Sequence, residues 1–178
     1  MKEQWRDRKG FVSLFVLLLF ASMLPLLFFS LVELQYLYAM KDRAQQIADR
    51  MAEAAIQEID EDAWGRHEVV IDERSAKEIA NRLFEENTNK MEGAIREATA
   101  PVIMVGNDVP IAVSVNGQTI QLSHPFVMVS VSLAPKGIFF RGMEVHGFAI
   151  EQAVREGDFS QSIEQAVRFQ KWWQIVDE

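Results

Sequence analysis

Apolar residues dominate one early stretch of the chain. Residues 11–32 carry no charge, are mostly Leu, Phe and Val, and have Ser13, Ser22 and Ser30 as their polar side chains. At a rise of ~1.5 Å per residue, a helix of this length reaches about 33 Å and can cross the hydrocarbon core of a bilayer. Serine can bond back to its own helix, so these side chains permit insertion. The sequence therefore predicts one membrane-spanning helix over residues 11–32, bent locally at Pro25.

Helical periodicity continues beyond this apolar run. Apolar residues recur every three or four positions, which is the spacing of one helix face; these residues, called the seam below, are Leu37, Met40, Ala44, Ile47, Met51 and Ala54. Gly and Pro are absent from residues 26–63, so we expect one continuous helix that ends near Gly65. The seam is rich in alanine and allows a close neighbour, either the core of the domain that follows or a helix of another subunit.

The segment after this helix predicts a second helix. Ser75 and Glu78 have the spacing of a capping box, and an intermittent apolar face runs on to Ile95. Gly93 and then Pro101 are expected to end this helix. A short strand is expected before it, at residues 68–71.

The pattern then changes to that of β-strands. Residues 126–133 alternate, with Val127, Val129, Val131 and Leu133 on one face. A proline turn separates them from a long returning strand at residues 143–154. Shorter β-branched runs predict strands at 102–105, 111–115 and 119–122, and Asn116-Gly117 joins the last two as a hairpin. The predicted fold is α+β: an antiparallel sheet covered by one face of the long helix, with a last helix after Asp158 or Ser160.

Charge divides the chain into an N-terminal tail and an acidic remainder. Lys2, Arg6, Arg8 and Lys9 precede the apolar run, whereas residues 39–178 hold 14 basic and 23 acidic side chains within a formal net charge of −8. The positive-inside bias places the N-terminus in the cytoplasm and the C-terminal domain outside. A cleaved secretory signal usually has an apolar run of ~7–15 residues, so we expect the longer run here to be retained. An acidic domain disfavours nucleic acid as a partner.

Candidate chemistry is sparse. Asp60, Asp62 and Gly65 match part of a calcium loop, but Trp64 and Ile71 occupy positions that need oxygen ligands. Glu144 and His146 lie two residues apart and share a strand face, which permits a metal pair but does not imply one. The chain has no cysteine, and it shows neither a phosphate-binding loop nor a nucleophile elbow. We therefore predict no cofactor, no metal and no enzymatic activity.

The order of these features resembles a known family. A basic tail, Gly10-Phe11 and an apolar helix lead into an alanine-rich segment, followed by a valine-alternating strand, a proline turn and a closing strand. This order is similar to that of the TadE/TadG-like family, pilin-like components of the tight-adherence (Flp-type, type IVb) pilus assembly machinery. The similarity is greatest over the anchor and the alanine-rich segment, which contains Ala44, Ala48, Ala52, Ala54 and Ala55.

The resemblance implies a pilin-like fold in the bacterial cytoplasmic membrane and a role in assembly with other pilus or secretion subunits. The domains would be a cytoplasmic tail (1–10), a membrane helix (11–32), a helical spine (33–63) and an extracytoplasmic α+β domain (64–178). An anchored binding or sensory accessory protein unrelated to pili is the alternative, in which the same helix is only a tether.

The resemblance also implies a processing junction. Prepilin peptidase cuts after a glycine that precedes a hydrophobic residue, and Lys9-Gly10-Phe11 is similar to that site; Gly10 can equally be a loop residue before a helix. Such pilins usually carry a glutamate where this chain has Phe15. A carboxylate in lipid requires a partner, so its absence predicts a minor subunit at the tip or base, or an uncut assembly factor held in the membrane.

Overall fold

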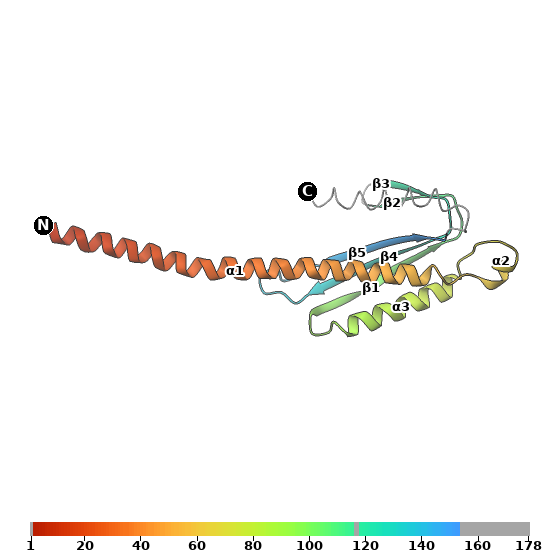
Figure 1. Cartoon of the computed structure of the whole chain (residues 1–178), viewed down its shortest axis with the longest axis horizontal. Helices are drawn as coiled ribbons and strands as arrows, with labels where there is room; N and C mark the ends of the chain where they lie inside the picture. Colours follow the sequence, from red (N-terminus) through yellow and green to blue (C-terminus); the bar gives the residue numbers. More distant parts are fainter. Residues whose placement is uncertain (1, 116–117, 154–178) are drawn as a thin grey trace.

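The computed structural model describes residues 2–115 and 118–153. Three helices, α1 (Lys2–Ala55), α2 (Glu61–Gly65) and α3 (Glu73–Asn89), precede five strands: β1 (Ile95–Gly106), β2 (Ile111–Val115), β3 (Gln118–Leu122), β4 (Phe126–Pro135) and β5 (Val145–Gln152). The C-terminal half of α1 lies along the sheet, and its N-terminal half projects away from the rest of the molecule (Figure 1). This arrangement confirms an α+β fold with a long apolar N-terminal helix and a small antiparallel sheet. The helix expected after Asp158 or Ser160 lies outside the described residues.

Helix α1 ends at Ala55, earlier than the sequence pattern suggested. Polar contacts made after Ala55 explain the early end. Asp60 accepts a hydrogen bond from the Ala63 N–H at 2.9 Å and so caps α2, while its own N–H donates to the Val70 carbonyl at 2.9 Å. The strand expected at residues 68–71 is reduced to one bridge between Ile59 and Ile71. The expectation of an unbroken helix to residue 63 was wrong because these contacts to the returning chain replace further helical turns.

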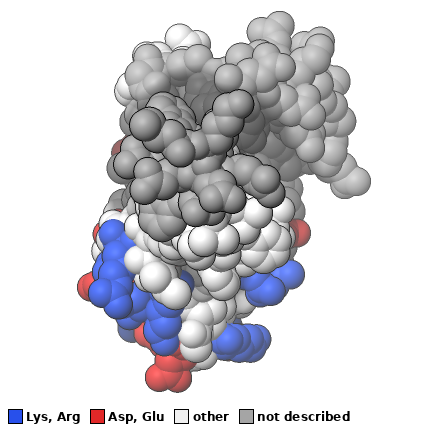
Figure 2. All heavy atoms as spheres, turned by 90° about the vertical axis from the view of Figure 1, so that its left-hand side faces the viewer, with Lys and Arg blue, Asp and Glu red and all other residues white. Residues whose placement is uncertain are grey.

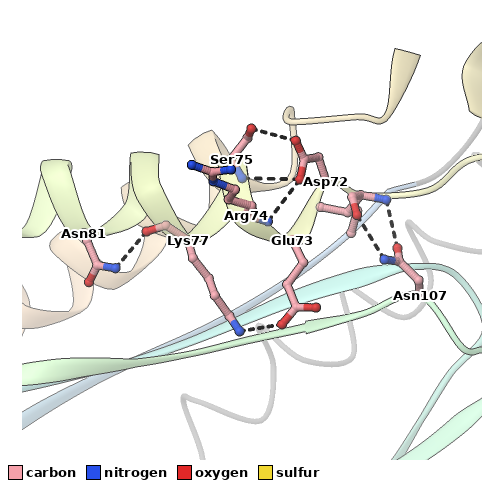
Figure 3. Close-up of polar contacts among 8 residues, drawn as sticks. Asp72, Glu73, Arg74, Ser75, Lys77, Asn81 and Asn107 are labelled. Carbon is pink, nitrogen blue, oxygen red and sulfur yellow. Dashed lines mark hydrogen bonds and ion pairs between the residues drawn. The ribbon is translucent and has the colours of Figure 1, made fainter. Parts of the chain in front are cut away.

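Helix α3 begins at a different cap from the one predicted. Asp72 is the N-cap and accepts hydrogen bonds from the N–H groups of Arg74, at 3.0 Å, and Ser75, at 3.4 Å. The Ser75 hydroxyl donates to the same carboxylate at 2.7 Å (Figure 3). The expected cap at Ser75 was wrong, because Asp72, three residues earlier, satisfies the free N–H groups of the first turn. The helix ends at Asn89, before Gly93, and buries Ala76, Ala80 and Phe84.

One side chain joins the start of α3 to the end of β1. The Asn107 side-chain amide accepts a hydrogen bond from the Ile71 N–H at 2.8 Å and donates to the Ile71 carbonyl at 3.0 Å (Figure 3). Ile71 is only 1% exposed, so Asn107 satisfies both backbone groups of a core residue.

The main sheet has the strand order β1-β4-β5, and both pairings are antiparallel. Strand β1 begins at Ile95, which the sequence pattern assigned to a helix. Pro101 lies inside this strand rather than ending a helix, at a register shift between the Thr99 and Val102 pairs. A shift of this kind accommodates a residue that cannot donate to the ladder. Strand β5 is shorter at both ends than the expected range of 143–154.

The remaining strand predictions are confirmed. Strands β2 and β3 pair as a hairpin with Val115 opposite Gln118, although the connecting residues 116–117 are not among those described. In β4, all four residues of the alternating face are fully buried: Val127, Val129, Val131 and Leu133. The core lies between this face, the C-terminal half of α1 and the buried side of α3.

Candidate functional site at the junction of helix and domain

The projecting half of α1 presents large apolar side chains on every side over residues 12–32. Its large side chains from Val12 to Val32 are between 44% and 66% exposed, and none of the most apolar window is buried within the chain. Hydrocarbon is the environment that accepts such a surface without penalty. The helix is long and apolar enough for a single membrane span.

Two serines of the apolar run are satisfied by the helix itself. The Ser22 hydroxyl donates to the Leu19 carbonyl at 2.8 Å, and the Ser30 hydroxyl donates to the Leu26 carbonyl at 2.9 Å. These two bonds confirm, for Ser22 and Ser30, the expectation that the serines bond back to their own helix. The helix continues through Pro25. Both features suit a helix in lipid, where water cannot satisfy polar groups.

Glu33, the first charged residue after the apolar run, binds the loop between β4 and β5. Its carboxylate accepts hydrogen bonds from three successive backbone N–H groups: those of Ile138, of Phe139 at 2.8 and 3.0 Å, and of Phe140 at 3.2 Å. Successive N–H groups that converge in this way form a nest for an anion. Desolvation raises the pKa of Glu33, but the three N–H groups outweigh it and hold the pKa below its usual value. The carboxylate is therefore charged at neutral pH and fixes the loop to α1.

Tyr36 makes a second contact between α1 and the domain, about one turn after Glu33. Its hydroxyl donates a hydrogen bond to the Ala94 carbonyl, which lies just before β1. Desolvation by burial raises the pKa of Tyr36 above its usual value, so the hydroxyl keeps its proton and remains a donor. Glu33 and Tyr36 thus attach two different loops to the part of α1 that follows the apolar run.

Farther along, α1 packs directly against the edge strand β5. Gly147 of β5 is opposite Ala44 and Gln45, and a side-chain carbon at residue 147 would overlap the Ala44 carbonyl and lie 2.6 Å from the Gln45 nitrogen. The Gln45 amide donates to the Phe148 carbonyl at 2.8 Å and accepts from the Phe148 N–H at 3.1 Å. These bonds satisfy backbone groups that an edge strand would otherwise leave unpaired.

The seam on α1 belongs to the core of this chain. Leu37, Met40, Ala44, Ile47 and Met51 are at most 7% exposed, and the last four form one cluster with β4, β5 and α3. Ala54 is half-buried. Of the two neighbours that the sequence left open for the seam, the structure shows the core of the same chain: the five buried residues already have partners there, and not on an assembly surface. The alanines permit the close approach to β5 that a larger side chain would block.

Beside Gln45, carboxylates from two elements lie close together. Desolvation and the neighbouring charges of Asp49 and Glu53 raise the pKa of Glu151 on β5. Desolvation also raises the pKa of Asp49, as does Glu53, although a hydrogen bond from Gln45 at 2.7 Å opposes this. Within residues 2–115 and 118–153 the structure places no group of three or more metal-ligating side chains in a suitable arrangement. Glu144 instead accepts a hydrogen bond from the Ser132 hydroxyl at 2.8 Å.

The predicted processing junction lies inside α1. Gly10 and Phe11 follow eight helical residues, so the interpretation of Gly10 as a loop residue before a helix was wrong. Phe15, where a pilin would carry a glutamate, is 59% exposed on the projecting half. Whether the chain is cut after Gly10 stays a prediction.

Four contact residues were not singled out from the sequence: Glu33, Tyr36, Gln45 and Gly147. A glycine inside a strand indicates a bulge or a close backbone approach, so Gly147 carried a usable signal. Gln45 and Tyr36 gave no such signal in the sequence, because their hydrogen-bond partners are 103 and 58 residues away.

No family model matches this chain, and no curated protein or solved structure is significantly similar to it. The geometry defines a small α+β domain joined to one projecting apolar helix by contacts at Glu33, Tyr36 and Gln45.

Proposed function

We propose that this chain is a single-pass membrane protein that acts as a pilin-like minor subunit or membrane-held assembly factor of a type IVb, tight-adherence pilus or a related secretion machine. One observation carries the proposal: a single helix is uncharged and exposes its large apolar side chains over residues 12–32, and then becomes the spine of an antiparallel sheet. Such a helix holds a folded domain at a fixed position on a membrane. The protein acts by assembly with related subunits and not by catalysis.

The charges at the two ends of the apolar run support the orientation. Four basic residues precede the run, and Glu33 is the first charged residue after it. Basic residues are retained on the cytoplasmic side, so the N-terminus lies inside and the domain lies outside the bacterial cytoplasmic membrane.

Because the seam is buried within the chain, assembly uses other surfaces of α1. The projecting half is available for helix packing within the membrane. Leu34 and Tyr38 add exposed apolar side chains just beyond it, at 39% and 59% exposure. In a bilayer, helices associate through close packing and polar contacts rather than hydrophobicity. The proposed contact between subunits is therefore made by the exposed side chains of residues 12–38, which leaves out Glu33, Tyr36 and the buried Leu37.

Cleavage after Gly10 would distinguish a pilin from an uncut assembly factor. Co-expression with a prepilin peptidase, followed by intact-mass measurement, tests it: loss of residues 1–10 supports pilin processing. A Gly10→Ala variant is the matched control and is expected to keep its full mass. If a known pilin is cut in the same cells and this chain is not, the protein is an uncut assembly factor.

A tether for a binding or sensory domain is the second candidate, and the burial of the seam favours it. Because the chain has no cysteine, a single Leu24→Cys variant reports helix association cleanly. Disulfide-linked dimers in native membranes, absent for a Trp64→Cys control in the domain, support assembly. A monomer in both variants, together with the absence of genes for a secretion ATPase and membrane platform beside this gene, supports the tether.

A further inference from the structure

The loop between β4 and β5 presents apolar side chains at one end of the domain. Its tip consists of Ile138, Phe139 and Phe140, called the apolar loop below. In Figure 1 this connection leaves the end of the sheet that faces the N-terminus of α1. Of the domain contacts along α1 described above, the one made by the apolar loop to Glu33 is nearest to the apolar run.

The apolar loop is held in an exposed conformation. Ile138 is 81% exposed and Phe139 is 48% exposed, and Met143 beyond them is 50% exposed. Gly142 has a φ of 89°, a backbone conformation that glycine adopts without strain and that returns the chain to β5. A loop that is bound to α1 and exposes several large apolar side chains indicates a surface that something else covers.

Glu33 determines how far the apolar loop lies from the membrane. It follows the last apolar residue, Val32, and a span of residues 11–32 reaches about 33 Å against a hydrocarbon thickness of about 30 Å. The carboxylate therefore lies at the edge of the hydrocarbon. Because three N–H groups of the apolar loop bind this carboxylate, the loop tip lies at the same level.

We infer that the apolar loop inserts into the interface of the bilayer that α1 crosses, so that the domain contacts the membrane at a second point. The inference rests on the proposed membrane span. The proposed partner of the apolar loop is lipid, because the bilayer itself lies beside an inserted helix at this level.

The charges next to the apolar loop fit this assignment. Lys136 and Arg141 flank the tip in sequence, and the Lys136 ammonium, which has three donors, uses one on the Glu92 carbonyl at 3.0 Å. Basic side chains around apolar ones are typical of segments that lie in a lipid interface and contact anionic headgroups. Seen from the end from which α1 projects, Lys and Arg side chains lie on both sides of a largely uncharged surface, with Asp and Glu side chains beside them (Figure 2).

Depth-dependent fluorescence quenching tests the inference on the full chain. Single cysteines are introduced into the cysteine-free chain as Ile138→Cys, Phe20→Cys and Trp64→Cys, labelled with a nitrobenzoxadiazole dye and reconstituted in vesicles of phosphatidylcholine and phosphatidylglycerol. Lipids carrying a nitroxide near the headgroup, or deep in the acyl chain, act as quenchers. We expect the probe at 138 to lose most of its emission with the shallow quencher, the probe at 20 with the deep one, and the probe at 64 with neither.

The probes at residues 20 and 138 test different proposals. If the probe at residue 20 is not quenched, the proposed membrane span is overturned. Quenching at 20 without quenching at 138 would overturn the insertion of the apolar loop and leave the span intact, with the loop open to a protein partner instead.

A Glu33→Gln variant tests the positioning role of the carboxylate. It keeps the shape of the side chain but removes the charge that the three N–H groups bind. We expect weaker shallow quenching at 138 and unchanged deep quenching at 20, which also shows that the variant is inserted. Unchanged quenching at 138 would overturn the role of Glu33 in setting the level of the loop.

Discussion

Gly147 is the residue whose replacement most directly tests the packing of α1 on the sheet. An alanine at this position places a methyl group against the Ala44 carbonyl, and the obstacle is helix backbone rather than a flexible side chain. The helix must therefore move away from β5. The movement also lengthens both hydrogen bonds between Gln45 and Phe148, which are now 2.8 and 3.1 Å long.

Two energetic costs determine how much Gly147→Ala destabilises the fold. Forcing extra volume into a packed core costs about 1–3 kcal/mol, and each weakened hydrogen bond adds about 0.5–1.5 kcal/mol. We expect Gly147→Ala to lower the free energy of unfolding by roughly 2–6 kcal/mol. For a domain of this size that corresponds to a fall in Tm of roughly 10 °C.

Thermal unfolding of the full chain in detergent micelles, followed by near-ultraviolet circular dichroism, measures this change. Gly93→Ala is the matched control, because a side-chain carbon at residue 93 meets no atom within 4 Å; a change within about 0.5 kcal/mol is expected there. Adding Gln45→Ala to Gly147→Ala should cost less than Gln45→Ala alone, because the bonds to Phe148 are already weakened. Equal Tm values for Gly147→Ala and Gly93→Ala would refute direct contact between α1 and β5.

Three further predictions concern the core and its charges. Met51→Ala should cost about 2–5 kcal/mol, because Met51 is fully buried; a loss below 1 kcal/mol in the same assay would contradict its place in the core. Asn107→Leu should cost about 1–3 kcal/mol, because it leaves the buried Ile71 N–H and carbonyl unpaired, with loss of amide-exchange protection at residue 71 as the check. Glu151→Gln should raise stability at pH 7 by about 0.2–0.5 kcal/mol, the size of a like-charge penalty. Desolvation by burial, with the charges of Asp49 and Glu53, raises the pKa of Glu151 in the folded state, so its contribution to stability is present below the ordinary glutamate pKa and is lost as pH rises through the raised value. The variant should therefore remove part of the fall in stability above about pH 4, and an unchanged pH profile would contradict the raised pKa of Glu151.

Local pattern predicted the elements whose partners are near in sequence or whose surface is uniform. The uncharged run at residues 11–32 needed only its length and composition to indicate a helix suited to lipid. Alternation in β4 predicted which valines are buried, and Asn116-Gly117 predicted the hairpin of β2 and β3. The seam was recognised as one helix face, because helical spacing depends only on neighbouring turns.

The three-dimensional structure alone decided what the seam packs against and where the elements end. Helical spacing is the same whether the partner is a sheet in the same chain or a helix in another, so the burial of Met40 and Met51 could not be read from it. Helix α1 stops at Ala55 and α3 starts after Asp72 because of contacts with distant or competing polar groups, which local propensity does not contain.

The junction of helix and domain depended most on the tertiary structure. Glu33 is an ordinary charged residue after an apolar run until the β4–β5 loop, more than 100 residues later, brings three N–H groups to its carboxylate. Gln45 and Gly147 acquire their roles in the same way, because an edge strand and a helix backbone meet there. The sequence by itself determined that this protein has an apolar helix and a small sheet; long-range packing determined that the two are held together at a fixed level beside the apolar run.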